Sequence, residues 1–273
     1  MKIQVVGLGT VGLPTAVHVS RFFDVTGYDV SHDKLEKASK LIAVSSVLSE
    51  ADVYVIAVNT GINCDNSLDM SAVFDVCSRI AKVQPDALVV VESTVSVGTC
   101  RQVAERYGLR RLVHCPHRFW SGDPVRYGVV QERVLGGLNG ESLEAGGEFY
   151  SRLGIPTCVV SSLEVAELAK VTENAYRFVE IAFAESLALT CEKQGISFEE
   201  VRKACNTLKR PEHGYQIQIL EAKNGIEGHC LPKDIRYLLK ANDSELLKGA
   251  ILTDKHYKLR QKERSAEEIE DYA

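Results

Sequence analysis

"VVGLGTVGLP", residues 5–14, contains Gly7, Gly9 and Gly12 in the spacing GxGxxG. It follows a run of β-branched residues typical of a buried strand and opens a pattern typical of a helix. Glycines at these positions allow a tight turn and let the backbone approach a pyrophosphate, which the helix N-terminus binds through its N–H groups. The stretch therefore predicts a dinucleotide-binding turn.

A second apolar run ends at "VTGYD", residues 25–29, and places an acidic residue in a position of interest. Asp29 stands where a carboxylate binds the ribose diol of adenosine. Because this carboxylate repels a 2′-phosphate, we expect NAD rather than NADP. The alternative is a glycine turn that binds no dinucleotide, and the agreement of spacing, order and Asp29 favours the cofactor.

Short strand-like runs alternate with helical patterns through the first 160 residues. The strand-like runs cover 3–7, 52–58, 87–93, 111–115, 131–137 and 157–160. The helical patterns between them cover 10–23, 71–83, 98–108 and 141–153. Continuous apolar strands separated by amphipathic helices indicate a parallel sheet covered on both faces. We therefore predict an α/β fold with a Rossmann-like, doubly wound parallel sheet over residues 1–160.

The pattern changes to a single long helix after residue 160. No glycine or proline occurs between Ser162 and Gly195. Ser161 and Glu164 have the spacing of a capping box, and Gly195 fits a helix stop. An all-α domain is expected over 161–257.

Two further expectations concern this helical part. Residues 258–273 are heavily charged and are expected to form a solvated helix end or a frayed tail. The long helix is apolar nearly all round, so it must be covered on every side. We therefore predict a homodimer that forms through the helical domain.

Composition and charge exclude several classes of protein. The chain has 273 residues, of which 45% are hydrophobic and 25% charged, and its formal net charge is -5. An acidic chain of this kind argues against a nucleic-acid binder. Met1 is followed by no apolar signal core, and the longest apolar runs are far short of a membrane span. We expect a cytoplasmic enzyme with no membrane partner.

The eight cysteines form no CxxC pair, so zinc ribbons and redox pairs are poorly supported. Cys230 nevertheless differs from the others because its neighbourhood, "GIEGHCLPKD" (225–234), is polar and rich in glycine. Metal ligation with His229 has weak support without a distant ligand pair, so no metal is expected. A nucleophilic thiolate near Lys233 fits better, and an inert buried thiol is the alternative.

The long helix also carries two polar residues that share a face. Lys170 and Asn174 are four residues apart in a largely apolar segment. They either pair with Glu167 or Glu173, which would be purely structural, or line a polar pocket. The spacing alone favours the structural interpretation.

Several motifs together resemble the UDP-glucose/GDP-mannose dehydrogenase family of nucleotide-sugar 6-dehydrogenases. The resemblance runs from Met1 to about residue 255. Its motifs, in order, are "GLGTVGLP", "ESTVSVGT", "CPHRFWSGD…ERVLGG", "ELAKVTENAYR" and "GIEGHCLPKD". The last two are the most specific.

The resemblance implies that a C6 alcohol of a nucleotide sugar, which we interpret as a UDP-sugar, is oxidised twice and that two NAD+ are reduced. Cys230 would attack the aldehyde to form a thiohemiacetal, and its oxidation would give a thioester that water hydrolyses to the uronate. Lys170 and Asn174 would stabilise the oxyanion. Asp234 would order the water or accept a proton, and Thr94 would hold the water near the nicotinamide. The implied cofactor-binding residues are Gly7, Gly9, Thr10, Val11, Gly12, Asp29, Lys34, Thr60 and Thr94.

The sequence departs from the family pattern in three places. His117 stands where the family usually has a glutamate that activates the hydrolytic water; it either acts as the base or merely fills space. Glu227-Gly228 replaces the usual Gly-Gly before the cysteine, and this carboxylate either faces solvent or reads the sugar. The usual third, nucleotide-binding domain has no counterpart, so we expect a separate polypeptide to complete the site, a compact version of the enzyme, or a truncated chain.

Two other functions remain as alternatives. A two-domain hydroxyacid or polyol dehydrogenase would use Lys170 and Asn174 without covalent catalysis at Cys230. A non-catalytic subunit would bind NAD and need a partner protein for turnover.

Overall fold

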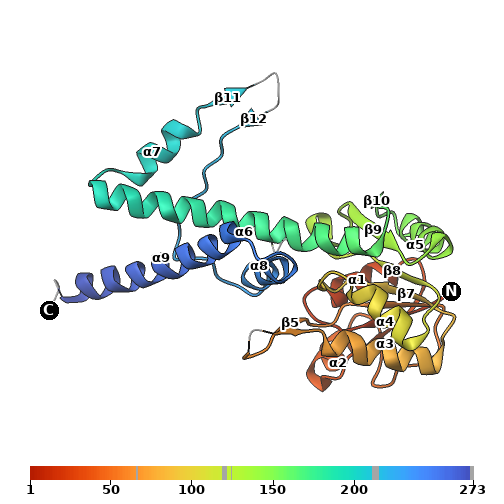
Figure 1. Ribbon diagram of the computed structural model, residues 1–273. Helices are drawn as coiled ribbons and strands as arrows, with labels where there is room; N and C mark the ends of the chain where they lie inside the picture. Colours follow the sequence, from red (N-terminus) through yellow and green to blue (C-terminus); the bar gives the residue numbers. More distant parts are fainter. Residues whose placement is uncertain (66, 119–121, 124, 211–214, 271–273) are drawn as a thin grey trace. The chain divides into compact units, whose positions relative to one another are not determined.

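The computed structural model describes residues 1–65, 67–118, 122–123, 125–210 and 215–270 (Figure 1). The chain divides into two compact units, Met1–Val171 and Thr172–Ala273. Each unit has its own buried core.

The first unit is built on an eight-stranded sheet of order β10-β9-β8-β7-β4-β1-β2-β3. Its strands are β1 (Lys2–Val6), β2 (Asp24–Tyr28), β3 (Ala43–Ser45), β4 (Val53–Ile56), β7 (Leu88–Val91), β8 (Leu112–His114), β9 (Arg133–Gly137) and β10 (Thr157–Val159). Neighbouring residues of β4, such as Val55 and Ile56, point to opposite faces and are both fully buried. Both faces of the sheet are therefore covered, which confirms the predicted Rossmann-like α/β fold.

One pair of strands departs from the expected parallel arrangement. β9 pairs with β8 antiparallel, and β10 pairs with β9 parallel, so β9 and the edge strand β10 run opposite to the other six strands. The connection from β8 to β9 contains the short π-helix η1 (Val125–Val129) in place of a crossover helix. A parallel neighbour requires such a crossover, whereas an antiparallel neighbour does not.

Five helices and a small hairpin complete the first unit. The helices are α1 (Gly12–Val19), α2 (His32–Ser39), α3 (Ser71–Val83), α4 (Thr99–Tyr107) and α5 (Gly140–Arg152), and the hairpin joins β5 (Gly61–Ile62) to β6 (Leu68–Asp69). Apolar residues of α1, α2 and α5 pack with β1, β4 and β7 in one core cluster. Alternation of strand and helix along the sequence produces this layering.

The long helix predicted from the sequence is α6 (Leu163–Gln194), and it continues unbroken from the first unit into the second. Its first turns pack on β9. A Cβ at Gly136 would lie 2.4 Å from the Ser162 carbonyl oxygen and 3.0 Å from the Ala166 Cβ. This close packing explains why the division between the units falls at Val171, inside the helix, rather than near residue 160.

The second unit consists of the remainder of α6 and four further elements (Figure 1). These are α7 (Phe198–Cys205), a hairpin of β11 (Lys209–Arg210) and β12 (Tyr215–Gln216), α8 (Cys230–Ala241) and α9 (Glu245–Glu270). Its core joins Phe178 and Ala182 of α6 to residues of α8 and α9. The hairpin is a small exception to the expected all-α character.

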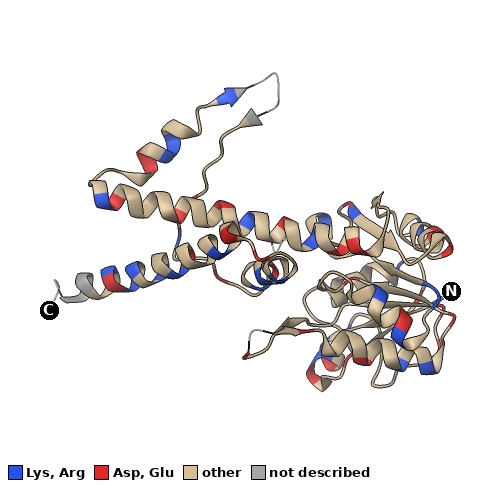
Figure 2. Ribbon diagram, in the orientation of Figure 1, with Lys and Arg blue, Asp and Glu red and all other residues tan. Residues whose placement is uncertain are grey.

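Helix α9 includes most of the segment expected to be a charged tail, and Figure 2 shows charged residues spaced along it. Residues 271–273 of that segment lie outside the described residues. Among the described helices, even the 32-residue α6 lacks an apolar stretch of the kind that crosses a bilayer.

Candidate active site

The glycine turn lies between β1 and α1 and is tight at two of its three glycines. Gly7 has a φ of +93°, and a Cβ there would lie 2.4 Å from the Ala57 carbonyl oxygen. A Cβ at Gly12 would lie 1.8 Å from the Gly7 carbonyl oxygen. At Gly9, in contrast, an added Cβ would meet no atom of the described residues within 4 Å. The turn therefore leaves open space beside the N-terminus of α1, where the N–H groups of Thr10 and Val11 precede the helix.

Asp29 follows β2 and is held next to this turn. Its Oδ2 accepts a hydrogen bond of 2.8 Å from the Leu8 N–H, and its Oδ1 accepts one of 2.9 Å from the Ser31 N–H. The Nζ of Lys34 lies 3.3 Å from Oδ2. The carboxylate is therefore fixed at the edge of the sheet that carries the glycine turn. Open space at Gly9, a helix N-terminus and a fixed carboxylate fit a dinucleotide.

Thr60 and Thr94 lie at the same edge of the sheet. They follow β4 and β7, which run parallel to β1. The Thr60 hydroxyl donates a hydrogen bond of 2.7 Å to the Thr94 carbonyl oxygen. The first unit therefore brings together all the cofactor residues predicted from the sequence, because the carboxyl ends of parallel strands meet at one edge.

His117 and Lys170 are both buried in the first unit, with 5% and 8% of their surface exposed. Burial, reinforced by the positive charges of Arg133 and Lys170, lowers the pKa of His117 to about 2. Burial lowers the pKa of the neighbouring His114 to about 3, and Lys170 contributes. His117 is therefore neutral at physiological pH, and the ordinary pKa expected from the sequence does not apply to it.

A buried polar network in the first unit was not recognised from the sequence. The Glu92 carboxylate accepts hydrogen bonds from the guanidinium of Arg133, from the Tyr150 hydroxyl at 2.8 Å and from the Thr15 hydroxyl at 3.3 Å. Arg133 is fully buried and also donates to the Val129 carbonyl oxygen at 2.9 Å. A charged residue inside the apolar run "RVLGG" was the available signal, since buried arginines require a partner.

Glu167 has a structural role that separates it from Lys170. Its carboxylate accepts hydrogen bonds from the backbone N–H groups of Gly98, at 2.5 Å, and Cys100, at 2.7 Å. These N–H groups belong to the N-terminal end of α4, where negative charge is favourable. One alternative from the sequence paired Glu167 with Lys170 or Asn174. The contacts of Glu167 with α4 do not support that pairing.

The residues predicted in the second unit gather around α8. Cys230 is the first residue of this helix and is exposed. Asp234 is one turn later on the same face and is 1% exposed. Its Oδ2 accepts a hydrogen bond of 2.5 Å from the Asn174 side chain, and its Oδ1 lies 2.6 Å from the Lys233 Nζ. Lys233 thus forms an ion pair with Asp234, whereas the sequence suggested that it lies near the Cys230 thiolate.

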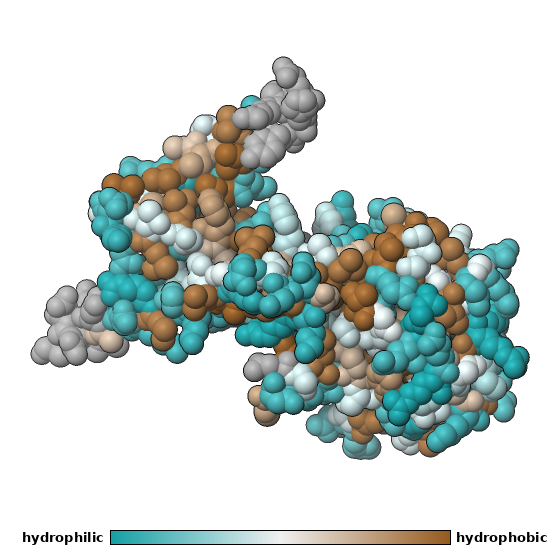
Figure 3. Space-filling model, viewed as in Figure 1, coloured by the Kyte–Doolittle hydropathy of each residue, from teal (hydrophilic) through white to brown (hydrophobic). Residues whose placement is uncertain are grey.

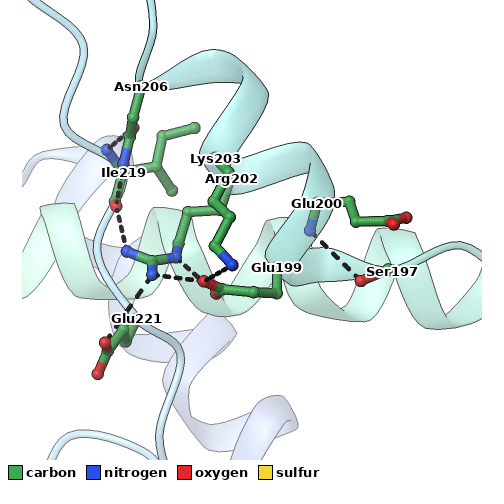
Figure 4. A network of polar contacts seen from close by, with 8 residues as sticks. All are labelled: Ser197, Glu199, Glu200, Arg202, Lys203, Asn206, Ile219 and Glu221. Carbon is green, nitrogen blue, oxygen red and sulfur yellow. Dashed lines mark hydrogen bonds and ion pairs between the residues drawn. The ribbon is translucent and has the colours of Figure 1, made fainter.

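A cavity of about 450 Å³ borders the loop that precedes Cys230. Its lining residues are Arg177, Ile181, Arg202, Asn206, Gln218, Ile219, Leu220, Glu221, Lys223, Gly225, Ile226, Glu227 and Leu231. Figure 4 shows that Arg202 contacts Glu199 and Glu221, while Asn206 exchanges two hydrogen bonds with the backbone of Ile219. The cavity offers basic groups and a fixed backbone to a polar ligand.

Glu227 of the unusual Glu227-Gly228 pair is exposed and also lines this cavity. Both expectations for its carboxylate, contact with solvent and contact with a sugar, are therefore compatible with its position. The Phe-Trp-Ser part of the "CPHRFWSGD" motif, residues 119–121, lies outside the described residues.

Comparison with known proteins identifies two matching domains. Residues 37–154 match the NAD binding domain of the UDP-glucose/GDP-mannose dehydrogenase family, and residues 164–255 match the central domain of the same family. NAD is therefore the cofactor of this chain, in agreement with the glycine turn and Asp29.

Individual relatives agree with these matches. The chain is 30% identical to the UDP-N-acetyl-D-mannosamine dehydrogenase of Campylobacter jejuni, over 89% of this chain and 68% of that protein. The solved UDP-D-ManNAc dehydrogenase from Pyrococcus horikoshii is similar with a TM-score of 0.82 and 28% identity, over 94% of this chain and 69% of that one. The UDP-N-acetyl-mannosamine dehydrogenase from Staphylococcus aureus has a TM-score of 0.84 and 26% identity, over 100% and 72%.

The curated relatives are longer than the matched region, since the chain spans about two thirds of their length. The similarity to the Staphylococcus aureus structure covers 100% of this chain and therefore includes both the glycine turn and the segment around Cys230. The chain belongs to the UDP-glucose/GDP-mannose dehydrogenase family.

Proposed function

We propose that this protein oxidises the C6 alcohol of a UDP-sugar to the uronate, with NAD as the hydride acceptor in both steps. The exposed thiol of Cys230, at the start of α8 and one turn from the Asn174–Asp234 pair, is the observation that carries the proposal. A thiolate adds to an aldehyde, so the intermediate stays bound for the second oxidation.

The proposed reaction consists of two oxidations and a hydrolysis. Loss of hydride and the hydroxyl proton converts the alcohol to an aldehyde, and the Cys230 sulfur then bonds to that carbon to give a thiohemiacetal. Loss of a second hydride and proton gives a thioester. Water adds to the thioester carbon, the carbon–sulfur bond breaks, and the carboxylate and the thiolate are released.

Asn174, Asp234 and Lys170 have distinct proposed roles. The Asn174 amide, which is held by Asp234, donates to the oxygen that becomes negative during addition of the thiolate. Asp234 orders the hydrolytic water or accepts its proton. Lys170 stabilises the same oxyanion, which requires the two groups of residues to meet around the substrate.

His117 has a weaker proposed role than the sequence suggests. A base is most effective when its pKa is near the working pH, and the pKa of His117 is about 2. The neutral imidazole can still accept a hydrogen bond from water. We therefore propose that His117 orients the hydrolytic water while Asp234 or bulk water takes the proton.

A UDP-linked N-acetylhexosamine is the proposed substrate. The relatives described above are dehydrogenases of UDP-N-acetylmannosamine. The cavity beside the Cys230 loop contributes Lys223, whose charge suits a phosphate group. Glu227, at the rim of the same cavity, suits sugar hydroxyl groups because carboxylates accept hydrogen bonds from them.

The test is turnover of UDP-N-acetylmannosamine, UDP-glucose and GDP-mannose with NAD+, with the product identified by mass. We expect a UDP-sugar to give two NADH per acid formed and the Cys230→Ser variant to give no acid. Cys158→Ser is the matched control, because Cys158 is also exposed and lies on β10. One NADH per turnover with full activity of Cys230→Ser would favour a simple hydroxyacid or polyol dehydrogenase.

We also propose that the protein is a homodimer through its second unit. Tyr176 and Phe183 of α6 are 65% and 60% exposed, and none of the eight residues of α7 is buried. Figure 3 shows apolar surface over this part of α6 and α7. Exposed aromatic residues of this kind are enriched at protein interfaces. Sedimentation at micromolar concentration tests the proposal, and a monomer that persists at high concentration contradicts it.

A further inference from the structure

Helix α9 holds the loop that precedes Cys230 at Ile226. The Ile226 N–H donates a hydrogen bond of 2.7 Å to the Asp254 Oδ1, and the Ile226 carbonyl oxygen accepts one of 2.6 Å from the Lys258 Nζ. The same Lys258 Nζ lies 2.8 Å from the Asp254 Oδ2. Asp254 and Lys258, which we call the α9 clamp, thus bind both backbone polar groups of Ile226 with one ion pair.

The packing around Ile226 fits the α9 clamp closely. Gly225 has a φ of +99°, and a Cβ at this position would lie 2.4 Å from the Lys258 Cγ. The Ile226 side chain is 3% exposed and packs in the core of the second unit. The residues that follow, Glu227 to Cys230, are all exposed. Ile226, which the clamp binds, is therefore the last buried residue before the exposed segment that carries the thiol.

A second acid lies next to the clamp. Glu185 of α6 is fully buried, and among the described residues neither of its carboxylate oxygens has a hydrogen-bond partner. Its electrostatic neighbours are Asp254, Lys258 and Tyr257, all on α9. Unsatisfied buried polar groups destabilise a fold and are expected where function constrains the sequence. Attachment of α9 to the loop does not by itself require a buried acid such as Glu185 next to Asp254 and Lys258.

We propose that Asp254 and Lys258 are positioning residues, which fix the Cys230 thiol by holding the loop at Ile226. Cys230 is four residues beyond the clamp, so freedom at Ile226 spreads directly into the segment that presents the thiol. Misplacement of a reacting group by about 1 Å can lower a rate by about 100-fold. The catalytic consequence rests on the proposed function of Cys230, whereas the effect on the loop rests on the contacts alone.

The experiment compares Lys258→Met and Asp254→Asn with Arg260→Met. Arg260 is the matched control because it is also a basic residue of α9, and it joins α9 to α6 through an ion pair of 2.8 Å with Glu192. Three quantities are measured in the full chain: hydrogen exchange of the Ile226 amide, the rate at which iodoacetamide alkylates Cys230, and kcat and KM with NAD+ and UDP-N-acetylmannosamine.

We expect Lys258→Met to accelerate exchange of the Ile226 amide at least about tenfold, since hydrogen bonds to charged groups are the stronger ones. The alkylation rate of Cys230 should change, and kcat should fall by about ten- to 100-fold while KM for NAD+ is unchanged. Asp254→Asn should have a smaller effect because its amide oxygen still accepts from Ile226. Arg260→Met should resemble the wild type in all three quantities.

The proposal is overturned if, in folded Lys258→Met, the Ile226 amide exchanges and Cys230 is alkylated at the wild-type rates. It is equally overturned if Arg260→Met changes these two rates by the same factor as Lys258→Met. It is also overturned if the Ile226 amide of the wild type exchanges at the rate of an unprotected peptide, a result that needs no variant to fold. A wild type without turnover of any nucleotide sugar contradicts the proposed function instead, and exchange and alkylation then still decide the question of the clamp.

Discussion

The side chain of Asn174 on α6 donates a hydrogen bond of 2.5 Å to Asp234 on α8. This bond joins two residues that are 60 positions apart in the sequence, and it fixes which way the Asn174 amide points. The Asp234 carboxylate also forms an ion pair with Lys233, which compensates its charge. The pair therefore gives α8, and Cys230 at its start, a polar connection to the long helix.

We predict that Asn174→Ala lowers kcat by about 100-fold or more, because removal of one oxyanion donor has that effect in other enzymes. The free energy of unfolding should fall by about 1–3 kcal/mol, since a buried carboxylate loses a donor. Steady-state kinetics and urea unfolding measure both. Asn139→Ala is the control: it removes the N-cap of α5 at a similar cost in stability, about 0.5–2 kcal/mol, and should leave kcat unchanged. Equal losses of kcat in the two variants would refute a catalytic role of Asn174.

Replacement of Asp29 should change cofactor binding. Asp29→Ala removes the acceptor of two backbone hydrogen bonds and the charge that disfavours a 2′-phosphate. We expect NAD+ to bind at least about tenfold more weakly and the preference over NADP+ to shrink. Isothermal calorimetry with each cofactor measures this. Asp33→Ala, an exposed position on α2, should bind NAD+ as the wild type does. Unchanged selectivity in Asp29→Ala would place the adenosine ribose elsewhere.

The two buried histidines should make the protein unstable in mild acid. Their native pKa values, about 3 for His114 and about 2 for His117, lie below the ordinary value of 6.5. Between about pH 3 and pH 6.5 the histidines bind protons in the unfolded chain but not in the native state. The free energy of unfolding therefore falls as the pH falls below 6.5. Each histidine contributes about 1.4 kcal/mol per pH unit.

Urea unfolding at several pH values between 7.5 and 5 measures this slope. His117→Gln should reduce it by about 1.4 kcal/mol per pH unit, whereas His256→Gln, at an exposed position, should not. The same slope in His117→Gln and the wild type would mean that native His117 is protonated at these pH values.

Glu185 should have the opposite dependence on pH. Burial, with a contribution from Asp254, raises the pKa of Glu185 from 4.5 to about 7. The native state therefore retains a proton that the unfolded chain releases, and stability falls as the pH rises from 4.5 to 7. We expect Glu185→Gln to be more stable than the wild type at pH 8, by up to about 3 kcal/mol, and equal to it near pH 4.5.

Unfolding of Glu185→Gln at both pH values tests this expectation. Glu200→Gln, at an exposed position near the start of α7, serves as the control and should show no such difference. A loss of stability in Glu185→Gln at pH 8 would indicate that the native carboxylate has a favourable partner.

Local patterns in the sequence predict the fold well. The sheet of the first unit and the helix α6 follow from runs of apolar residues whose period depends on the secondary structure alone. The reversal of β9 is different, because the connection from β8 to β9 determines it and the residues within the strand do not. The same limit applies to the boundary at Val171, which depends on packing between Gly136 and α6.

The candidate site divides in a similar way. Gly7, Asp29 and Cys230 are recognisable because their neighbours in the sequence form motifs. The contacts of the α9 clamp span 28 and 32 residues, and no local pattern indicates them. The low pKa of His117 arises from burial and from Arg133 and Lys170, so it becomes visible only once the chain is folded.

Because Gly136 contacts the start of α6, a single methyl group added at this position would affect the whole helix. Alanine at this position would collide with the Ser162 carbonyl oxygen and force the first turn of α6 to tilt. Because the helix is unbroken over 32 residues, it behaves as a rod about 48 Å long. A tilt of about 5° at its beginning would displace its far end by about 4 Å. One added carbon atom on β9 would thus change the direction of an entire helix.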